Sequence, residues 1–259
     1  MNGKEYRMRR IFSEVDGNCT ILPIDHGIVM GNIEGLENPV QVLRDLYSDH
    51  IDAVLINEGV NHQALDLLGK RAAPSRILNA STYYENGNNV FHGPVYSAEF
   101  ALRKGYDAIK VLLLWDLPVE EKLKNVEFIA NLIEEANKWE IPVMVEPTTL
   151  HAIEDKHTRI AVLSDATRIA FELGADILKV AHPNDPDVLS NWCQYFNVPV
   201  VLLGGSKNDT VEEIIRKVAE AMEIGVKGIA MGRNVWQRPV QEAQSVFRQL
   251  IQVVHPQLQ

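Results

Sequence analysis

The sequence feature that most constrains the fold is a regular alternation of short apolar runs with longer amphipathic segments. Each short run is almost continuously apolar and rich in Val, Ile and Leu, as expected for strands buried on both faces of a parallel sheet. Eight buried strands that alternate with helices predict an α/β fold with a closed (β/α)8 barrel, the TIM-barrel architecture. The predicted strands are 20–25, 53–57, 76–81, 108–115, 142–147, 176–181, 198–205 and 228–233.

The longer segments have the pattern of helices that cover a sheet. In 119–139, apolar residues recur every three or four positions. In 209–224, Asp209 is the predicted N-cap, and Glu212 completes a capping box. The segment 157–173 ends just before a glycine, which is typical of a helix C-terminus.

An open doubly wound sheet is the alternative fold. Such a sheet commonly carries Gly-x-Gly-x-x-Gly after its first strand, but this chain has Asp25-His26-Gly27 there. No linker or change in composition divides the chain, and α/β barrels commonly reach about 250 residues. We therefore expect residues 1–259 to form one (β/α)8 barrel domain.

Composition and charge limit the classes of function. The chain has 25 Lys and Arg against 35 Asp and Glu, which gives a formal net charge of −10. This negative charge argues against nucleic acid as a partner but permits a local site for a phosphorylated small molecule. No apolar run approaches the ~20 residues of a membrane span, so no membrane partner is predicted. Cys19 and Cys193 lie far apart, and residues 1–10 lack the apolar core of a signal peptide, so we expect a cytoplasmic protein.

The histidines do not predict a metal site. Their spacings match no common ligand pattern, so neither a metal nor another cofactor is expected. The histidines considered are His62, His92, His151, His157 and His182.

Lys179 is the most informative residue because it interrupts the apolar run 176–181. Functional side chains of such barrels lie at the carboxyl ends of the strands, and Lys179 is close to one. Burial disfavours the charged form of lysine, and a neutral amine can attack a carbonyl group to form a Schiff base. The alternative is a lysine whose stem packs in the strand while its ammonium pairs with a carboxylate. The same alternative applies to Lys110 in 108–115.

Two glycine motifs predict a phosphate site. Gly204-Gly205-Ser206-Lys207 and Gly232-Arg233-Asn234 end the seventh and eighth predicted strands, whose following loops commonly bind phosphate in this fold. Glycine lets backbone N–H groups approach phosphate oxygens, and Arg233 adds a charged donor. The alternative is that the glycines only permit tight turns.

Two further features face the same end of the predicted barrel. Asp25 and His26 end the first strand, where Asp25 can orient substrate hydroxyls or transfer a proton and His26 is a candidate for substrate binding. An ordinary turn is the alternative. The segment 83–92, rich in Gly, Asn and Tyr, is predicted to be a loop and a candidate substrate lid.

Together these residues resemble the class I, Schiff-base aldolase family that includes archaeal-type fructose-1,6-bisphosphate aldolase, 2-amino-3,7-dideoxy-D-threo-hept-6-ulosonate synthase and the autoinducer-2 thiolase. The resemblance extends from about Arg10 to Val253. It is carried by Pro23-Ile24-Asp25-His26-Gly27, by Gly174-Ala175-Asp176-Ile177-Leu178-Lys179, by Gly204-Gly205-Ser206-Lys207 and by Gly232-Arg233-Asn234-Val235-Trp236-Gln237.

The resemblance implies a barrel in which Lys179 forms the Schiff base and Asp25 lies beside the substrate. It also implies a substrate that is a phosphorylated ketose or ketone, chemistry without a metal, and a homo-oligomer. The phosphate-binding residues implied in this way are Gly204, Gly205, Gly232 and Arg233.

The sequence departs from the family at one position. Several members carry an acid–base tyrosine after the fifth strand, and a gapless match from Lys179 places Thr148 there. Threonine is a poor acid near neutral pH, whereas Glu146 ends the same strand and can act as a general acid–base group if partly desolvated. Some related tagatose- and sulfosugar-phosphate aldolases resemble this Glu-Pro sequence. The alternative for Glu146 is an ion pair with Lys110 or Lys179.

Three functions follow as hypotheses. The first is a class I aldolase that cleaves or forms a carbon–carbon bond in a phosphorylated ketose through Lys179, with Glu146, Asp25 and Thr148 as the other catalytic candidates. The second is an acyl or ketol transferase that uses the same iminium. The third is a sugar-phosphate-binding barrel without catalysis.

Overall fold

The predicted barrel is present in the computed structural model, which describes residues 2–48, 50–86, 89–205 and 209–257. Eight parallel strands close on themselves in the order β1-β10-β9-β8-β7-β6-β3-β2. Each lies within or beside one of the eight predicted runs. The strands are β1 (Cys19–Pro23), β2 (Ala53–Ile56), β3 (Ser75–Asn79), β6 (Ala108–Leu114), β7 (Val143–Thr148), β8 (Ile177–Ala181), β9 (Val200–Leu203) and β10 (Gly228–Ala230).

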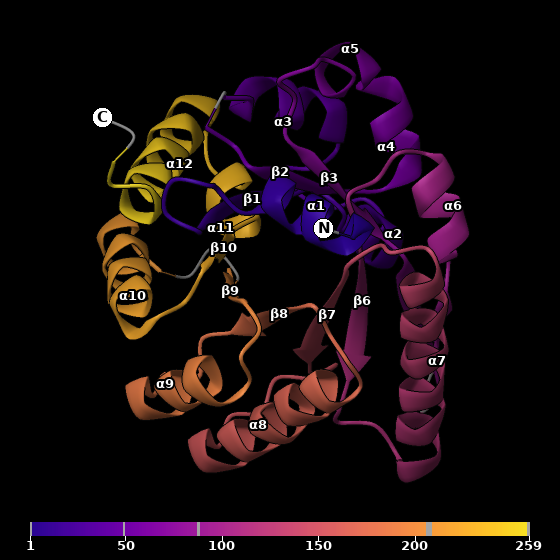
Figure 1. Cartoon of the computed structure of the whole chain (residues 1–259). Coiled ribbons are helices and arrows are strands. Elements are labelled where there is room, and N and C mark those ends of the chain that lie inside the picture. Colours follow the sequence, from indigo (N-terminus) through magenta and orange to yellow (C-terminus); the bar gives the residue numbers. More distant parts are fainter. Residues whose placement is uncertain (1, 49, 87–88, 206–208, 258–259) are drawn as a thin grey trace.

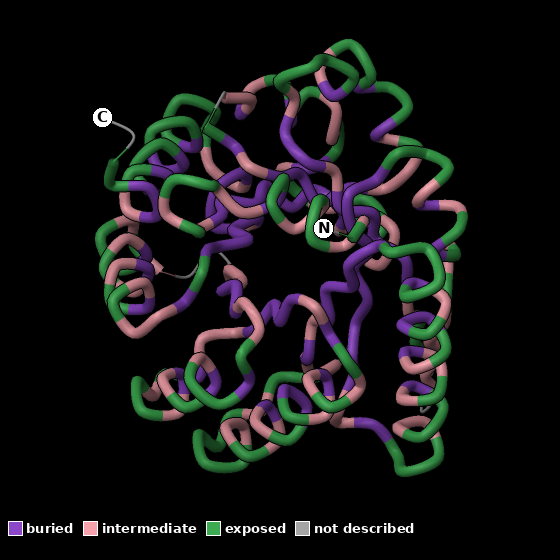
Figure 2. The backbone as a smooth tube through the Cα atoms, in the orientation of Figure 1, coloured by how far each residue is buried: buried purple, intermediate pink, exposed green. Residues whose placement is uncertain are grey.

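Helices surround the ring of strands (Figure 1), and their buried faces point toward it while their outer faces are exposed (Figure 2). None of the helices in the described part of the chain is long and apolar enough to cross a membrane. The helices after the first are α2 (Gly27–Met30), α3 (Pro39–Leu46), α4 (Glu58–Gln63), α5 (Leu65–Leu68), α6 (Ala98–Arg103), α7 (Val119–Lys138), α8 (Lys156–Glu172), α9 (Pro186–Tyr195), α10 (Val211–Ile224), α11 (Arg233–Trp236) and α12 (Val240–Val254).

The first helix, α1 (Gly3–Ile11), closes the amino-terminal end of the barrel. Ile11 belongs to the apolar cluster inside the strands. The Ser75 hydroxyl, at the start of β3, donates a hydrogen bond to the carbonyl of Arg10. Lys4 forms an ion pair with Asp176, which stands just before β8. Because α1 covers this end of the barrel interior, we expect a site inside the barrel to open at the carboxyl ends of the strands.

The capping box predicted for α10 is displaced by one residue. Thr210 is the N-cap, and its side chain accepts a hydrogen bond from the backbone N–H of Glu213, whose carboxylate accepts one from the N–H of Thr210. Asp209 forms an ion pair with Lys217 instead. A threonine hydroxyl and an aspartate carboxylate both suit an N-cap, so the sequence alone did not distinguish the two registers.

The prediction of a loop over 83–92 was wrong. The chain forms an antiparallel hairpin of β4 (Ser81–Asn86) and β5 (Asn89–Pro94), in which Tyr83 lies opposite His92. The Gly and Asn content favoured a loop, but Tyr, Val and Phe have high strand propensity. Thr82 and Tyr84 also donate hydrogen bonds to the carbonyl of Ile28 in α2, which fixes the hairpin against the barrel mouth.

Candidate active site

Three ionisable side chains lie inside the barrel, next to its apolar filling. Lys110, Glu146 and Lys179 each stand two residues after a member of the inner apolar cluster, on β6, β7 and β8. Alternate residues of a strand face the same side, so all three point inward. The strands are neighbours in the ring, which brings the three side chains together. Only 4% of Lys110 and 5% of Lys179 are exposed.

A single carboxylate oxygen joins the two lysines. The Oε2 of Glu146 accepts a hydrogen bond from the Nζ of Lys179 at 2.9 Å and lies 2.8 Å from the Nζ of Lys110. Lys110 also lies 3.5 Å from the Oδ2 of Asp25, which follows β1 across the barrel. The predicted candidates Lys179, Glu146 and Asp25 therefore form one buried network with Lys110. The contacts of Glu146 with both lysines are the ion pair that the sequence left open as the alternative for Glu146, whereas the contact of Lys110 with Asp25 was not predicted.

The charges in this network stabilise one another. Burial alone raises the pKa of Glu146, but the ammonium groups of Lys110 and Lys179 outweigh it and lower this pKa to about 2. Burial disfavours the charged form of Lys110, yet the carboxylates of Glu146 and Asp25 raise its pKa above the ordinary value. Lys179 thus has a carboxylate within hydrogen-bond distance that can exchange a proton with its amine.

His26 is a neutral ring beside the network. Burial lowers its pKa to about 4, although the charge of Asp25 acts in the opposite direction. Its ring makes an edge-to-face contact with Trp236, whose indole N–H donates to the carbonyl of Pro23. A Cβ on Gly232 would lie 3.0 Å from the Cε1 of His26 and 3.1 Å from the indole nitrogen of Trp236, so this glycine also has a packing role.

The two glycine motifs lie side by side because β9 and β10 are neighbours. Gly204 donates a backbone hydrogen bond to Ala230, and a Cβ on it would lie 2.2 Å from the Oδ1 of Asn234. Gly204 and Gly205 line a cavity of about 330 Å³, whereas Ser206 and Lys207 lie outside the described residues. None of the described residues forms an ion pair with Arg233, which begins α11.

Thr148 shares the inner face of β7 with Glu146, two residues further on. Its hydroxyl lies 3.5 Å from the carbonyl of Thr149. Sequence analysis missed Tyr83, which the hairpin brings to the barrel mouth. Burial raises the pKa of the Tyr83 phenol, and the charges of Glu85 and Glu146 add to this effect. No sequence signal marked Tyr83, because it came from a segment predicted to be a loop.

Asn57 and Asn79 were also not selected, although Asn57 ends the predicted strand 53–57 and Asn79 lies near the end of the predicted strand 76–81. Asn79 is only 1% exposed, on the inner side of β3. The signal that could have identified both is their position, since polar residues at the carboxyl ends of barrel strands commonly serve function.

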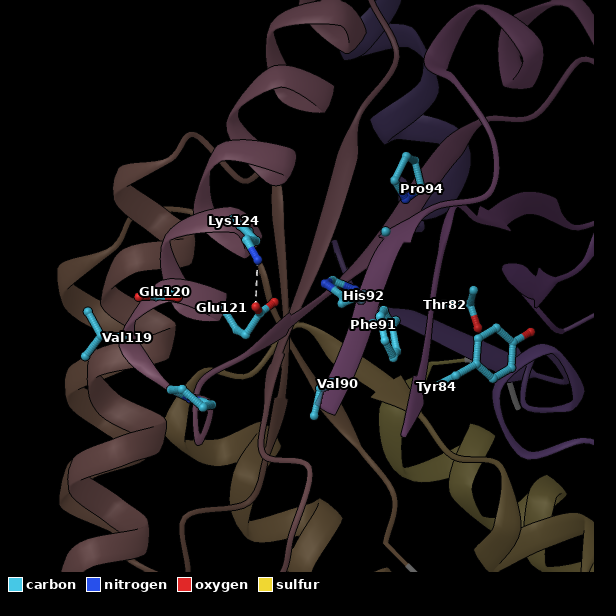
Figure 3. A pocket seen from close by; sticks show the side chains of 12 residues that line it. Thr82, Tyr84, Val90, Phe91, His92, Pro94, Val119, Glu120, Glu121 and Lys124 are labelled. Carbon is cyan, nitrogen blue, oxygen red and sulfur yellow. Dashed lines mark hydrogen bonds and ion pairs between the residues drawn. The ribbon is translucent and has the colours of Figure 1, made fainter. Parts of the chain in front are cut away.

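A larger hollow of about 800 Å³ lies outside the barrel, between the hairpin and the start of α7 (Figure 3). In its lining, Lys124 and Glu121 form an ion pair at 2.7 Å. None of the predicted catalytic or phosphate-binding residues lines it. The hollow is therefore separate from the buried pair of Lys179 and Glu146 inside the barrel. Side chains around the hollow include Thr82, Tyr84, Phe91, His92, Val119 and Glu120.

Comparisons with known proteins agree with the barrel fold. A family model described as DeoC/LacD family aldolase matches residues 19–238. The 2-amino-3,7-dideoxy-D-threo-hept-6-ulosonate synthase 1 of Archaeoglobus fulgidus is 32% identical over 91% of this chain and 85% of its own. The class 1 fructose-bisphosphate aldolase of Thermoproteus tenax is 31% identical over 95% of this chain and 92% of its own. An archaeal fructose-1,6-bisphosphate aldolase with its catalytic lysine covalently bound to a carbinolamine intermediate superimposes with a TM-score of 0.77, at 28% identity, over 96% of this chain and all of that one.

Proposed function

The chain belongs to the DeoC/LacD aldolase family, and from this membership we propose that Lys179 is its Schiff-base nucleophile and that its substrate is a phosphorylated ketose. Membership confirms the resemblance predicted from the sequence and makes the protein an enzyme of the class I aldolases, so the hypothesis of a binding protein without catalysis is set aside. The observation that carries the proposal is the hydrogen bond of the buried Lys179 to Glu146 inside the barrel.

The first half of the reaction forms the iminium. The Lys179 ammonium passes a proton to Glu146, and the neutral amine then attacks the ketone carbon of the substrate. After proton transfer from nitrogen to oxygen, the resulting carbinolamine holds a hydroxyl group. The Glu146 carboxyl group returns its proton to that hydroxyl, which leaves as water, and the carbon–nitrogen double bond of the iminium forms.

The second half breaks the carbon–carbon bond. The Glu146 carboxylate removes the proton of the hydroxyl two carbons from the iminium carbon, an aldehyde departs, and the bonding electrons move into an enamine. Glu146 then protonates the enamine carbon, and water releases the ketone product from Lys179. In this scheme Lys110 stays charged, because it faces both Glu146 and Asp25, and Asp25 lies where it can accept hydrogen bonds from substrate hydroxyls.

The phosphate site is proposed at the ends of β9 and β10. Its support is the adjacency of the two glycine motifs, the cavity lined by Gly204 and Gly205, and the Arg233 guanidinium, which has no ion pair within the described ranges. A Cβ on Gly205 would meet nothing within 4 Å, so this backbone has open space in front of it. An anchored phosphate would hold the ketone next to Lys179, since β8 is the neighbour of β9.

Transfer of an acyl or ketol group is the second candidate. It is favoured by the 32% identity to a heptulosonate synthase and by Thr148, which stands where several members carry tyrosine. A transferase would use the same iminium but pass the carbon fragment to a second substrate. Product formation with and without an added acceptor aldehyde separates the two candidates.

We also propose a cytoplasmic homo-oligomer. The support for association is a group of exposed apolar side chains on the hairpin and on α7: Tyr84, Phe91, Val119 and Leu123. The support for a reducing compartment is that Cys19 and Cys193 are both free. Light scattering of the purified protein tests the association.

Borohydride trapping tests the nucleophile. The protein is incubated with dihydroxyacetone phosphate, reduced and weighed by mass spectrometry. We expect a covalent adduct in the intact protein and in Lys104→Ala, a control that removes a half-exposed lysine paired with Glu58. Lys179→Ala should give none. An adduct that persists in Lys179→Ala would assign the nucleophile to another lysine.

A further inference from the structure

Asn79 is a buried amide whose polar atoms are left without partners. It is 1% exposed, and neither its Nδ2 nor its Oδ1 has a hydrogen-bond partner among the described residues. A buried amide without partners costs free energy, so folding alone gives no reason for it. Leucine at this position would avoid that cost. The amide is therefore expected to meet a polar group when the site is occupied.

The backbone places Asn79 in the candidate active site. It stands two residues after Ile77, a member of the inner apolar cluster, so its side chain points into the barrel. Its partner on the neighbouring strand is Lys110, which belongs to the charged network. On the other side, Ile56 pairs with Leu78, and extending that register by one residue places Asn57 beside Asn79.

Asn57 repeats the pattern in part. Its Nδ2 donates a hydrogen bond to the carbonyl of Asp25 at 2.8 Å, whereas its buried Oδ1 has no partner in the described ranges. Two neighbouring amides thus offer the barrel interior both N–H donors and carbonyl acceptors. A hydroxyl group both donates and accepts, so it can satisfy an amide in a way that an anion or an apolar group cannot.

Asn79 also lies on the far side of the ring from the proposed phosphate loops, three strands from β10 by way of β1 and β2. In the strand order, β3 is four steps from β9 in either direction. Lys179 on β8 and Lys110 on β6 lie between them on one side. A substrate anchored by phosphate near β9 and joined to Lys179 can extend its remaining carbons toward β3.

We propose that Asn79, assisted by Asn57, binds a hydroxyl group on the part of the ketose that lies beyond the Schiff-base carbon, and so selects a polyhydroxylated carbon chain. This inference rests on the proposed function. Asn79 is a specificity-determining residue in this account. It takes no proton and forms no covalent bond.

The experiment compares a short and a long ketone phosphate. Dihydroxyacetone phosphate reaches the phosphate loops and Lys179 but ends before Asn79, whereas fructose 1,6-bisphosphate and its C4 epimer tagatose 1,6-bisphosphate extend past it. Borohydride trapping gives the half-saturating concentration of each probe. Asn79→Leu removes the polar atoms at similar volume, and Asn79→Ser is a smaller second variant in case the first does not fold.

Asn125→Leu is the matched control. Asn125 is 2% exposed, but its Oδ1 accepts a hydrogen bond from the backbone N–H of Leu114 and so has a structural partner. We expect Asn125→Leu to lower the melting temperature without changing the preference between short and long probes. Asn79→Leu should keep or raise the melting temperature, because it removes an unpaired buried amide.

The expected result is that Asn79→Leu raises the half-saturating concentration of the better long probe by about tenfold, the value of one hydrogen bond, and leaves that of dihydroxyacetone phosphate within about twofold. Three outcomes would overturn the inference while the proposed function stands. They are equal changes for the short and long probes, no change for the long probes, and a wild type that traps only the short probe. A wild type that traps none of the three refutes the proposed function, and this inference falls with it.

Discussion

Glu146 and Lys179 face each other from neighbouring strands, with the carboxylate oxygen Oε2 2.9 Å from Nζ. The same oxygen lies 2.8 Å from Lys110, yet the two lysines differ. Lys110 has a second carboxylate, Asp25, at 3.5 Å, whereas Lys179 has only Glu146 among the described residues. The carboxylates of Glu146 and Asp25 together raise the pKa of Lys110 above its ordinary value, although burial acts in the opposite direction. This asymmetry agrees with the proposal that Lys179 is the nucleophile, and we expect Lys110 to remain charged.

Glu146→Gln tests the acid–base assignment. Glutamine keeps the shape but cannot carry a proton between the amine and the substrate, so kcat should fall about 10²- to 10⁴-fold. Thr148→Val removes the hydroxyl at the family tyrosine position and should cost less than about fivefold, the value of a weak hydrogen bond. Steady-state kinetics with the best ketose phosphate compares them. A larger loss in Thr148→Val than in Glu146→Gln would move the acid–base role to Thr148.

Lys110→Met tests the charge balance through the pH dependence of turnover. In the intact protein the pKa of Glu146 is lowered to about 2, so the carboxylate stays charged until the pH approaches that value. In Lys110→Met, only the Lys179 side chain still opposes the effect of burial, which raises the pKa of Glu146. This pKa should therefore rise toward its ordinary value of about 4.3. The acid limb of the kcat/KM profile should therefore move to higher pH.

Two controls accompany that profile. Lys104→Met removes a half-exposed lysine that pairs with Glu58, outside the network, and should leave the acid limb in place. Thermal unfolding checks that Lys110→Met folds, since breaking a buried ion pair costs about 3–5 kcal/mol. If Lys110→Met folds and its acid limb does not move, Glu146 is not the group that the limb reports.

Arg233→Met tests the phosphate site. Loss of a charge-assisted hydrogen bond to phosphate should raise KM for a ketose phosphate about 10- to 100-fold and change kcat by only a few fold, because the phosphate is held alike in the ground and transition states. Borohydride trapping of unphosphorylated dihydroxyacetone should be unaffected. Arg216→Met, which removes an exposed arginine paired with Glu220, is the control. An equal loss with dihydroxyacetone would mean that Arg233 does not act on the phosphate.

The sequence was sufficient to predict the barrel because parallel strands buried on both faces leave continuous apolar runs. Val200–Leu203 falls inside the predicted 198–205, and Ile177–Ala181 inside 176–181. The predicted strand 228–233 is longer than β10 because Gly232 and Arg233 already turn into α11. Lys179 stood out for a local reason, a single charge in an apolar run.

The contacts that define the site were less predictable. The contacts of Lys110 with Glu146 and Asp25 depend on the register between β6 and β7 and on the distance across the barrel. The sequence of a single strand does not encode that register or that distance. Asn79 drew no attention because an asparagine at a strand end is ordinary. Its significance is the absence of a partner within the described residues, which only a three-dimensional structure reveals.

A last prediction concerns stability at the opposite end of the barrel. His255, just after α12, lies with each ring nitrogen 2.9 Å from a carboxylate, Asp16 on one side and Asp52 on the other. Burial lowers the pKa of His255, but these two carboxylates outweigh it, and its pKa is raised above 6.5. The stabilisation of the fold by charged His255 is therefore complete below about pH 6.5 and is lost as the pH rises through the raised pKa.

His255→Gln should melt about 3 °C lower than the intact protein at about pH 6, and the difference should shrink toward about pH 9. Scanning calorimetry across this range measures it, with turnover as the check that the distant site is intact. A difference that stays constant with pH would show that His255 stabilises by packing rather than by charge.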